Sequence, residues 1–214
     1  MRVGRLCTLF CVLAFLFALA PALAGSASDA VTQDEASQIV HTQSRNEYAL
    51  LIGVDYFVSR ADTYPSSTNN VNAMQEVFQG ALNPFRAIIV PPDPVTTVEQ
   101  LTALIQKAFG AAQEGDVCYL YLSTHGVYDP ASGQEPMLLL SDGQTENGVT
   151  PAQLEAAFDG IDGTKVLILD ACNSGAFIGK GLPSLPEEVL FLGDDFKVLT
   201  SSGALEESWY WSVD

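Results

Sequence analysis

A cysteine and a histidine each follow a short apolar run of this chain. Cys172 lies within Asp170-Ala171-Cys172-Asn173-Ser174-Gly175, directly after the run 166–169. His125 comes 47 residues earlier and follows the run 117–122. A thiolate is a strong nucleophile, and an imidazole can accept or donate the proton that such a reaction moves. Each residue alone would more often be structural, but their paired placement predicts a thiol–imidazole dyad.

The dyad requires the two runs to be neighbouring strands. In a parallel sheet the carboxyl ends of the strands share one edge, and open α/β folds bind their ligands there. His125 and Cys172 would then meet at that edge. A neighbouring imidazolium, or the unpaired N–H groups of a helix N-terminus, would activate the thiol.

Short apolar runs alternate with helical patterns along most of the chain. Six runs predict buried strands, at 48–54, 86–90, 117–122, 137–140, 166–169 and 197–200. Strands that alternate with helices indicate an α/β sandwich with a mostly parallel sheet. Segment 128–148 is rich in Gly, Asp and Ser, which predicts an excursion carrying a short strand or hairpin. Segment 178–195 contains several Gly and Pro residues and predicts an exposed loop.

Three helices are predicted from apolar spacing and from capping signals. The clearest covers 96–113, where Thr96 and Glu99 offer a capping box. The apolar stripes assigned to the core are Leu101, Leu104, Ile105, Ala108 and Phe109 in this helix, Val71, Met74, Val77 and Phe78 in an earlier one, and Leu154 and Phe158 in a third, which Thr150, Pro151 and Gln153 introduce.

The first 24 residues have the pattern of a secretory signal. Arg2 and Arg5 precede an apolar stretch over 6–20, and Pro21-Ala22-Leu23-Ala24 supplies small residues for cleavage. An uncleaved anchor is the alternative, but the stretch is shorter than the ~20 residues that span a bilayer. We therefore predict an exported protein, secreted or periplasmic and without stable membrane insertion after signal removal, with a signal peptide at 1–24, a polar linker or pro-segment at 25–46 and one domain over 47–214.

Composition restricts the partners and the redox chemistry. Nine basic residues, two of them in the signal segment, face 26 acidic ones, so nucleic acid and anionic membrane surfaces are poor partners. Acidity generally serves solubility, and it also favours cationic ligands such as basic peptides. Only Cys118 and Cys172 remain after signal removal, and we expect Cys118 to pack as a small hydrophobe without a disulfide. His41 lies in the polar segment and is not assigned to the site.

The residues around the candidate dyad resemble those of the caspase-like cysteine peptidases, the superfamily of caspases, metacaspases and clostripain-like enzymes. Caspases carry Gln-Ala-Cys, a variable residue and Gly, with a histidine about 50 residues upstream, and Asp170 to Gly175 with His125 is similar. The resemblance extends from Tyr48 to the last residue. It implies a three-layer caspase-like sandwich with a mostly parallel central sheet flanked by helices, and a cysteine endopeptidase that acts on a protein or peptide substrate.

The resemblance also implies a role for each site residue. Cys172 attacks the scissile carbonyl, and His125 assists proton transfer to the departing amine. The backbone N–H groups of Gly126 and Cys172 stabilise the oxyanion, and glycine at 126 suits close backbone approach.

Asp170 differs from the glutamine of caspases and resembles the aspartate of metacaspases and clostripain-like enzymes. In those relatives this carboxylate faces the S1 pocket, which holds the residue before the scissile bond, and selects Arg or Lys. The resemblance therefore implies cleavage after Arg or Lys. Without the family, the residues favour an interpretation in which Asp170 caps the turn or helix that follows.

Other positions qualify what the resemblance implies. Asn72 stands where metacaspase-like sequences usually carry a second aspartate, so basic selectivity is expected to be weaker. Lys180 is the basic site at which self-cleavage is expected, as in some relatives. Calcium activates some relatives, but the acidic residues here show no EF-hand spacing, and no cofactor or metal site is predicted.

The chain ends soon after strand 197–200, whereas caspase-like domains generally continue, so the domain is predicted to be C-terminally incomplete. Two alternative functions stay open. One is a catalytically inactive caspase-like binding module, and the other is a related acyl-transfer enzyme.

Overall fold

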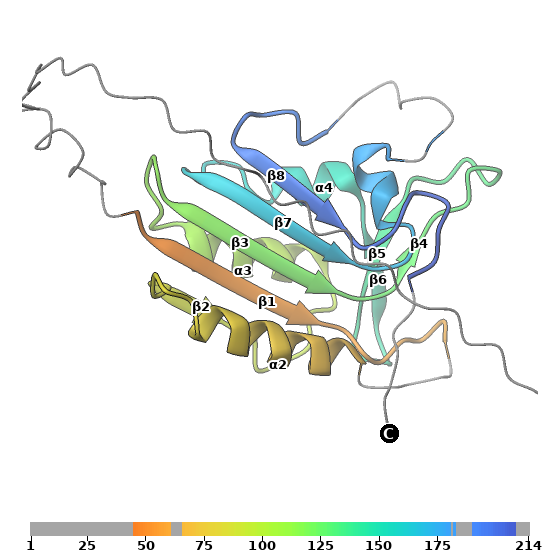
Figure 1. Ribbon diagram of the computed structural model, residues 1–214. Helices are drawn as coiled ribbons and strands as arrows, with labels where there is room; N and C mark the ends of the chain where they lie inside the picture. The colour runs from red at the N-terminus through yellow and green to blue at the C-terminus, as the bar shows by residue number, and fades with distance from the viewer. Residues whose placement is uncertain (1–44, 61–65, 181, 183–189, 209–214) are drawn as a thin grey trace, which may run out of the picture. The chain divides into compact units, whose positions relative to one another are not determined.

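A five-stranded parallel sheet is the framework of the computed structural model, which describes residues 45–60, 66–180, 182 and 190–208. The strand order is β2-β1-β3-β7-β8 (Figure 1). Its strands are β1 (Glu47–Gly53), β2 (Ala87–Ile89), β3 (Val117–Ser123), β7 (Thr164–Asp170) and β8 (Phe196–Thr200). Each lies within two residues of a predicted apolar run, so the predicted α/β fold with a mostly parallel sheet is confirmed.

The two faces of the sheet are covered by different helices. The helices are α2 (Ser66–Gln79), α3 (Val98–Phe109) and α4 (Pro151–Ala156). Leu50 and Leu120 share one apolar cluster with residues of α3 and α4, whereas Leu51 and Tyr121 share another with residues of α2. Because successive strand residues point to opposite faces, helices lie on both sides of the sheet and form the three layers of a caspase-like sandwich.

The start of α3 differs by one residue from the prediction. Thr97 is the N-cap: its Oγ1 accepts a hydrogen bond from the Gln100 N–H at 3.2 Å, and Gln100 Oε1 accepts one from the Thr97 N–H at 3.3 Å. The capping box predicted at Thr96 and Glu99 was therefore wrong. Two adjacent threonines followed by adjacent Glu and Gln satisfy the same signature in two registers, and only the backbone conformation distinguishes them.

The other helices agree with prediction except at two apolar residues. Phe158, assigned to the third helix, is buried but lies two residues beyond the end of α4. α4 begins as predicted, with Thr150 as N-cap and Gln153 completing the capping box. In α2, Met74 and Phe78 are half buried in the core, but Val77 is 65% exposed, so its assignment to the core was wrong. At about 100° per residue, Val77 lies beyond the flank of the stripe that faces the sheet.

The excursion predicted over 128–148 belongs to a second, antiparallel sheet. Its strands are β4 (Gly126–Val127), β5 (Met137–Ser141) and β6 (Glu146–Val149). The predicted short strand is confirmed as β5, and it pairs on both sides. Because β4 begins directly after His125, this sheet adjoins the edge at which the histidine lies.

Residues 181 and 183–189 of the predicted exposed loop over 178–195 lie outside the described residues, and those of the segment that are described are not uniformly exposed. Phe191 is only 7% exposed, and its ring lies 5.4 Å from that of Phe196. Ile178 ends a 3₁₀ helix, η1 (Ser174–Ile178), and is half buried. The prediction was therefore wrong at these positions, because apolar side chains near both ends of the segment pack against the core.

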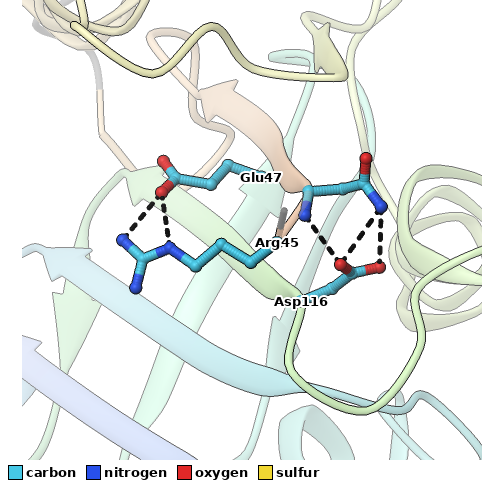
Figure 2. A network of polar contacts seen from close by, with 4 residues as sticks. Arg45, Glu47 and Asp116 are labelled. Atoms are coloured by element: carbon cyan, nitrogen blue, oxygen red, sulfur yellow. Dashed lines mark hydrogen bonds and ion pairs between the residues drawn. The ribbon is translucent and has the colours of Figure 1, made fainter. Parts of the chain in front are cut away.

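The first described residues join the domain through a polar network at the amino ends of β1 and β3 (Figure 2). The Asn46 N–H donates to Asp116 Oδ1 at 2.7 Å, and Asn46 Nδ2 donates to both carboxylate oxygens. Arg45 forms an ion pair with Glu47 at 2.8 Å. Burial raises the pKa of Asp116, but hydrogen bonds from Asn46 and Gln113 outweigh burial and lower it. Arg45 and Asn46, assigned to the polar segment 25–46, thus contact the domain.

The predicted signal segment 1–24 and His41 lie outside the described residues. Among the helices that are described, none is long and apolar enough to cross a membrane. The same part of the chain contains no group of three or more His, Cys, Asp or Glu residues that could hold a metal ion.

Candidate active site

β3 and β7 end at the same edge of the sheet (Figure 1). Ser123 pairs with Asp170 in register, and the Thr124 N–H extends the pairing to the Asp170 carbonyl oxygen at 3.1 Å. His125 and Cys172 each lie two residues beyond the Ser123–Asp170 pair. The structure thus brings together the two segments that the dyad requires.

Gly126 lies directly against the main chain of Cys172. A Cβ atom at residue 126 would lie 1.7 Å from the carbonyl oxygen of Cys172, far inside van der Waals contact. Glycine alone allows this approach, which holds the residue next to His125 against the cysteine turn. The close approach in the structure is to the cysteine turn, and the role expected of this glycine at the oxyanion stays a prediction.

The N–H of Gly126 points away from the second sheet. The Leu139 N–H donates to the His125 carbonyl oxygen at 2.9 Å, so the following pair, Gly126 and Leu138, is a non-hydrogen-bonded pair of the antiparallel ladder. The hydrogen bonds of the described residues include none from the Cys172 N–H. Both N–H groups assigned to the oxyanion hole can therefore donate to a bound oxygen.

His125 is half buried and contacts an aromatic ring. The Phe57 ring meets the imidazole edge-on, with ring centroids 4.5 Å apart and an interplanar angle of 62°. Phe57 is 7% exposed and restricts the orientation of the imidazole. It follows β1 by a few residues, and nothing in the local sequence connected it to the site.

Cys172 is half buried, and its sulfur contacts Ser208. The Ser208 N–H donates to Cys172 Sγ at 3.3 Å, and the thiol lies 3.6 Å from the Ser208 carbonyl oxygen. Cys118 differs sharply, because it is fully buried and burial raises its pKa to about 12. Both cysteines are free. The predictions of an inert packing role for Cys118 and of no disulfide between these two residues are confirmed.

The residue after the cysteine is in an uncommon backbone conformation. Asn173 has a φ of 57°, a left-handed value that Asn adopts more readily than most residues. Its N–H donates to the Glu206 carbonyl oxygen at 2.8 Å, and its Nδ2 donates to the Ala204 carbonyl oxygen at 2.9 Å. Asn173 thus turns the chain and ties the turn to the loop after β8.

Two serines of the same loop hold the other residues beside Cys172. Ser201 Oγ accepts a hydrogen bond from the Ala171 N–H at 3.0 Å. Ser202 Oγ donates to the Ala171 carbonyl oxygen at 2.9 Å and accepts one from the Ser174 N–H at 3.2 Å. The main chain on both sides of the cysteine is therefore fixed by the segment 201–206. Nothing in the sequence indicated these serines, because they lie far along the chain from Cys172 and match no catalytic motif.

Asp170 accepts hydrogen bonds from side chains of β3 and α2. Its Oδ2 accepts from the Tyr121 hydroxyl at 2.8 Å, from Asn70 Nδ2 at 3.2 Å and from the Ser123 hydroxyl at 3.4 Å. None of these donors belongs to the turn that follows, and the N-cap position of η1 is Asn173. The alternative interpretation of Asp170 as a cap is therefore wrong. Its strand register turns the carboxylate to the α2 side instead.

Asn70, and not Asn72, is the α2 residue in contact with Asp170. Asn72 is exposed, and it lines a separate pocket with Val71 and Val90. Positions 70 and 72 are about 200° apart around a helix, so only one of them can face this carboxylate. Neither Asn70 nor Tyr121 was singled out by the sequence, although Tyr121 shares the face of β3 with Ser123 and the period-two pattern could have indicated it.

Lys180 has an exposed side chain and a hydrogen-bonded main chain. Its N–H donates to the Gly175 carbonyl oxygen at 2.7 Å, and its carbonyl oxygen accepts from the Ala204 N–H at 2.8 Å. The peptide bond after Lys180 would have to leave this pairing before it could enter an active site.

Fold and site together define a class of protein, namely an α/β protein with a cysteine turn and a histidine turn at adjacent ends of a parallel sheet. The chain belongs to the caspase domain family, whose model matches residues 46–208. This is a family of cysteine peptidases, so the resemblance drawn from the two motifs is confirmed.

Two solved structures are similar to this chain, and the first of them agrees with this fold. Caspase-1 from Spodoptera frugiperda superposes with a TM-score of 0.50 at 17% identity, covering 78% of this chain and 62% of that one. Protein GSU0716 from Geobacter sulfurreducens gives a TM-score of 0.47 at 19% identity, covering 61% of this chain and 51% of that one. The chain thus spans about half to three fifths of the length of these two structures. No curated protein matches the chain significantly.

Proposed function

We propose that this protein is a cysteine endopeptidase that cleaves after Arg or Lys and uses Cys172 and His125 as its dyad. The observation that supports it best is the contact of Gly126 with Cys172 at the shared ends of β3 and β7. Membership of the caspase domain family, which acts on protein substrates, supports the same activity.

The proposed reaction begins when the Cys172 thiolate attacks the carbonyl carbon of the scissile bond. The C–N bond breaks as His125 donates a proton to the departing amine, which leaves a thioester. The N–H groups of Gly126 and Cys172 donate to the oxyanion. Water then attacks the thioester while His125 accepts one of its protons, the C–S bond breaks, and the carboxylic acid leaves with the Cys172 thiolate and protonated His125 restored.

Asp170 is the proposed determinant of basic selectivity. Its carboxylate is half buried, and the three groups that donate to it are neutral. Neither of the two ion pairs between described residues involves it. A partly desolvated carboxylate without a cation is costly, so a guanidinium or ammonium of the substrate supplies the missing partner. Asn70 contributes an amide rather than a second acid, and we expect weaker selectivity than two carboxylates would give.

Matched peptide reporters that end in Arg, Lys or Asp test this proposal. We expect turnover after Arg and Lys that is lost in Cys172→Ala and retained in Cys118→Ala, because the second thiol is buried and inert. Turnover after Asp would keep the peptidase but contradict the role of Asp170. Transfer of the acyl group to an added amine in preference to water would favour the acyl-transfer enzyme.

The inactive binding module makes a different prediction. It predicts no turnover of any reporter by folded protein and no labelling of Cys172 by a basic peptide electrophile. Labelling that is specific for Cys172, read by mass spectrometry against Cys118→Ala, would contradict it.

Export is a separate proposal, supported by the pattern of residues 1–24. We expect the mature chain to begin near Gly25 and to be secreted or periplasmic. Amino-terminal sequencing of the protein from its native cell tests this, and an intact Met1 would contradict it.

Self-cleavage after Lys180 is proposed as a maturation step of the same peptidase. The two backbone hydrogen bonds of Lys180 make us expect slow cleavage that accelerates when this segment opens. Identical single-chain masses for the wild type and Cys172→Ala after long incubation would contradict the step.

A further inference from the structure

The two oxygens of the Asp170 carboxylate are not equivalent. Oδ2 accepts the hydrogen bonds from Tyr121, Asn70 and Ser123, of which the bond from Tyr121 is the shortest at 2.8 Å. No hydrogen bond of the described residues reaches Oδ1. A carboxylate oxygen has two lone pairs, so Oδ2 is saturated while Oδ1 can still accept.

The Tyr121 hydroxyl is a fixed donor. The residue is 4% exposed and lies in the middle of the sheet, in register with Leu51 on one side and Ile168 on the other. Burial raises the pKa of Tyr121, and the hydrogen bond to Asp170 raises it further, so the phenol stays neutral. It therefore keeps donating to Oδ2 whatever occupies the space beyond Oδ1.

Arginine and lysine place different demands on such a carboxylate. A guanidinium binds best through two parallel N–H donors, one to each oxygen, whereas an ammonium is a compact charge that one oxygen satisfies. With Oδ2 saturated, the second donor of a guanidinium has no acceptor on Asp170. The advantage that arginine normally has over lysine at a carboxylate is then lost.

We propose that Tyr121 is a specificity-determining residue that, by occupying Oδ2 of Asp170, makes the S1 pocket accept lysine at least as well as arginine. This rests on the proposed function, in which Asp170 binds the residue before the scissile bond. Removing the hydroxyl takes away the shortest hydrogen bond to Oδ2 and leaves those from Asn70 at 3.2 Å and Ser123 at 3.4 Å. These two are long and weak, so a guanidinium N–H can displace one of them and arginine regains two-point binding.

The experiment compares kcat/KM for two reporters that differ only in Arg or Lys before the scissile bond. In the wild type we expect an Arg-to-Lys ratio of one or below. In Tyr121→Phe the ratio should rise by about five- to tenfold, the effect of one added charge-assisted hydrogen bond. Tyr119→Phe is the matched control, because Tyr119 lies on the same face of β3 but packs against Phe78 and Phe85. Its ratio should equal that of the wild type.

A wild-type preference for arginine above about tenfold, or an unchanged ratio in Tyr121→Phe, would overturn the inference. Thermal unfolding checks that each variant is folded. If Tyr121→Phe does not fold, Asn70→Ala removes the second donor to Oδ2 at the protein surface and should raise the ratio by a smaller factor.

Peptide binding separates this inference from the proposed function. In a Cys172→Ala background, calorimetry with peptides that end in Lys or Arg measures the Arg-to-Lys ratio of binding affinities without turnover. If the wild type neither cleaves nor binds basic peptides, both proposals fail. If it prefers basic peptides but the ratio does not move when the Tyr121 hydroxyl is removed, only the role of Tyr121 fails.

Discussion

At the scale of single residues, the site depends on main-chain contacts as much as on reactive side chains. Gly126 allows the histidine turn to touch the cysteine turn, and Asn173 takes up the left-handed conformation that directs the chain into η1. Ser201 and Ser202 hold Ala171 from the far side. The cysteine is therefore positioned by four residues, none of which supplies a reactive side chain.

Gly126→Ala tests this view of the site. The added Cβ would overlap the Cys172 carbonyl oxygen, so the two turns must separate. We expect the free energy of unfolding to fall by roughly 1–3 kcal/mol and turnover to fall by about 100-fold through misplacement of His125. Urea denaturation and reporter turnover measure the two effects.

Gly80→Ala is the control for that substitution. A Cβ at residue 80, at the end of α2, meets its nearest atom at 3.4 Å, an ordinary contact. It should leave turnover unchanged. Equal activity of Gly126→Ala and the wild type would show that the close approach is not required.

At the scale of elements, β3 and β7 decide which residues meet. Their register places the histidine and cysteine turns at equal distances beyond the last pair, and it places Asp170 beside Ser123. A slip of one residue would turn Asp170 to the opposite face, away from Tyr121. The many hydrogen bonds and the buried leucines of this strand pair therefore protect the geometry of the site.

The N-terminal capping of α3 can be tested by substitution. Thr97→Ala removes the side-chain oxygen that accepts the Gln100 N–H, and should lower the free energy of unfolding by about 1 kcal/mol. Thr96→Ala should have a smaller effect, because its hydroxyl only donates to Gln100 Oε1, which the main-chain N–H groups also reach. Thermal unfolding of both variants gives the comparison, and a larger effect at Thr96 would contradict the assigned N-cap.

At the scale of the whole domain, the two edges of the sheet have different tasks. The carboxyl edge carries the candidate active site. The amino edge carries charged networks. Asp116 accepts hydrogen bonds from Asn46 (Figure 2), and Lys165 forms an ion pair with Asp195 at 2.6 Å. This separation lets the amino edge contribute stability without constraining the chemistry.

Asp116 should make stability depend on pH. Because the folded pKa of Asp116 is lowered, its contribution is complete above the pKa of the unfolded chain, about 3.9, and is lost as the pH falls through the folded value. Asp116→Asn should lower the free energy of unfolding by about 1–3 kcal/mol at pH 7. The side-chain amide NH2 would replace a carboxylate oxygen that accepts from the N–H group of Asn46 or of Gln113. The difference from the wild type should shrink as the pH falls below 4.

Urea denaturation at a series of pH values measures this dependence. Asp93→Asn is the control, because Asp93 is an exposed loop residue outside the network. A difference between the wild type and Asp116→Asn that stays constant down to pH 2 would contradict the role of the Asp116 carboxylate.

The sequence by itself determined the α/β class, the six apolar strands and the start of α4, because hydrophobic period and capping chemistry are local properties. It also indicated the two motifs at the sheet edge, because catalytic residue types beside strand ends stand out against apolar runs. It placed the capping box of α3 one residue too early. Thr96 with Glu99 and Thr97 with Gln100 both satisfy the capping-box signature, and the sequence alone does not distinguish them.

Only the tertiary structure decided what surrounds those motifs. Tyr121, Asn70, Phe57 and the loop 201–208 reach the site from distant parts of the chain, and which of them touch depends on strand register and on the rotation of α2. From the residues alone, the carboxylate at position 170 favoured a cap of the following turn, and only the family resemblance favoured binding of a cation. The strand pairing turned it toward Tyr121, because side-chain direction in a sheet alternates and the register selects the face.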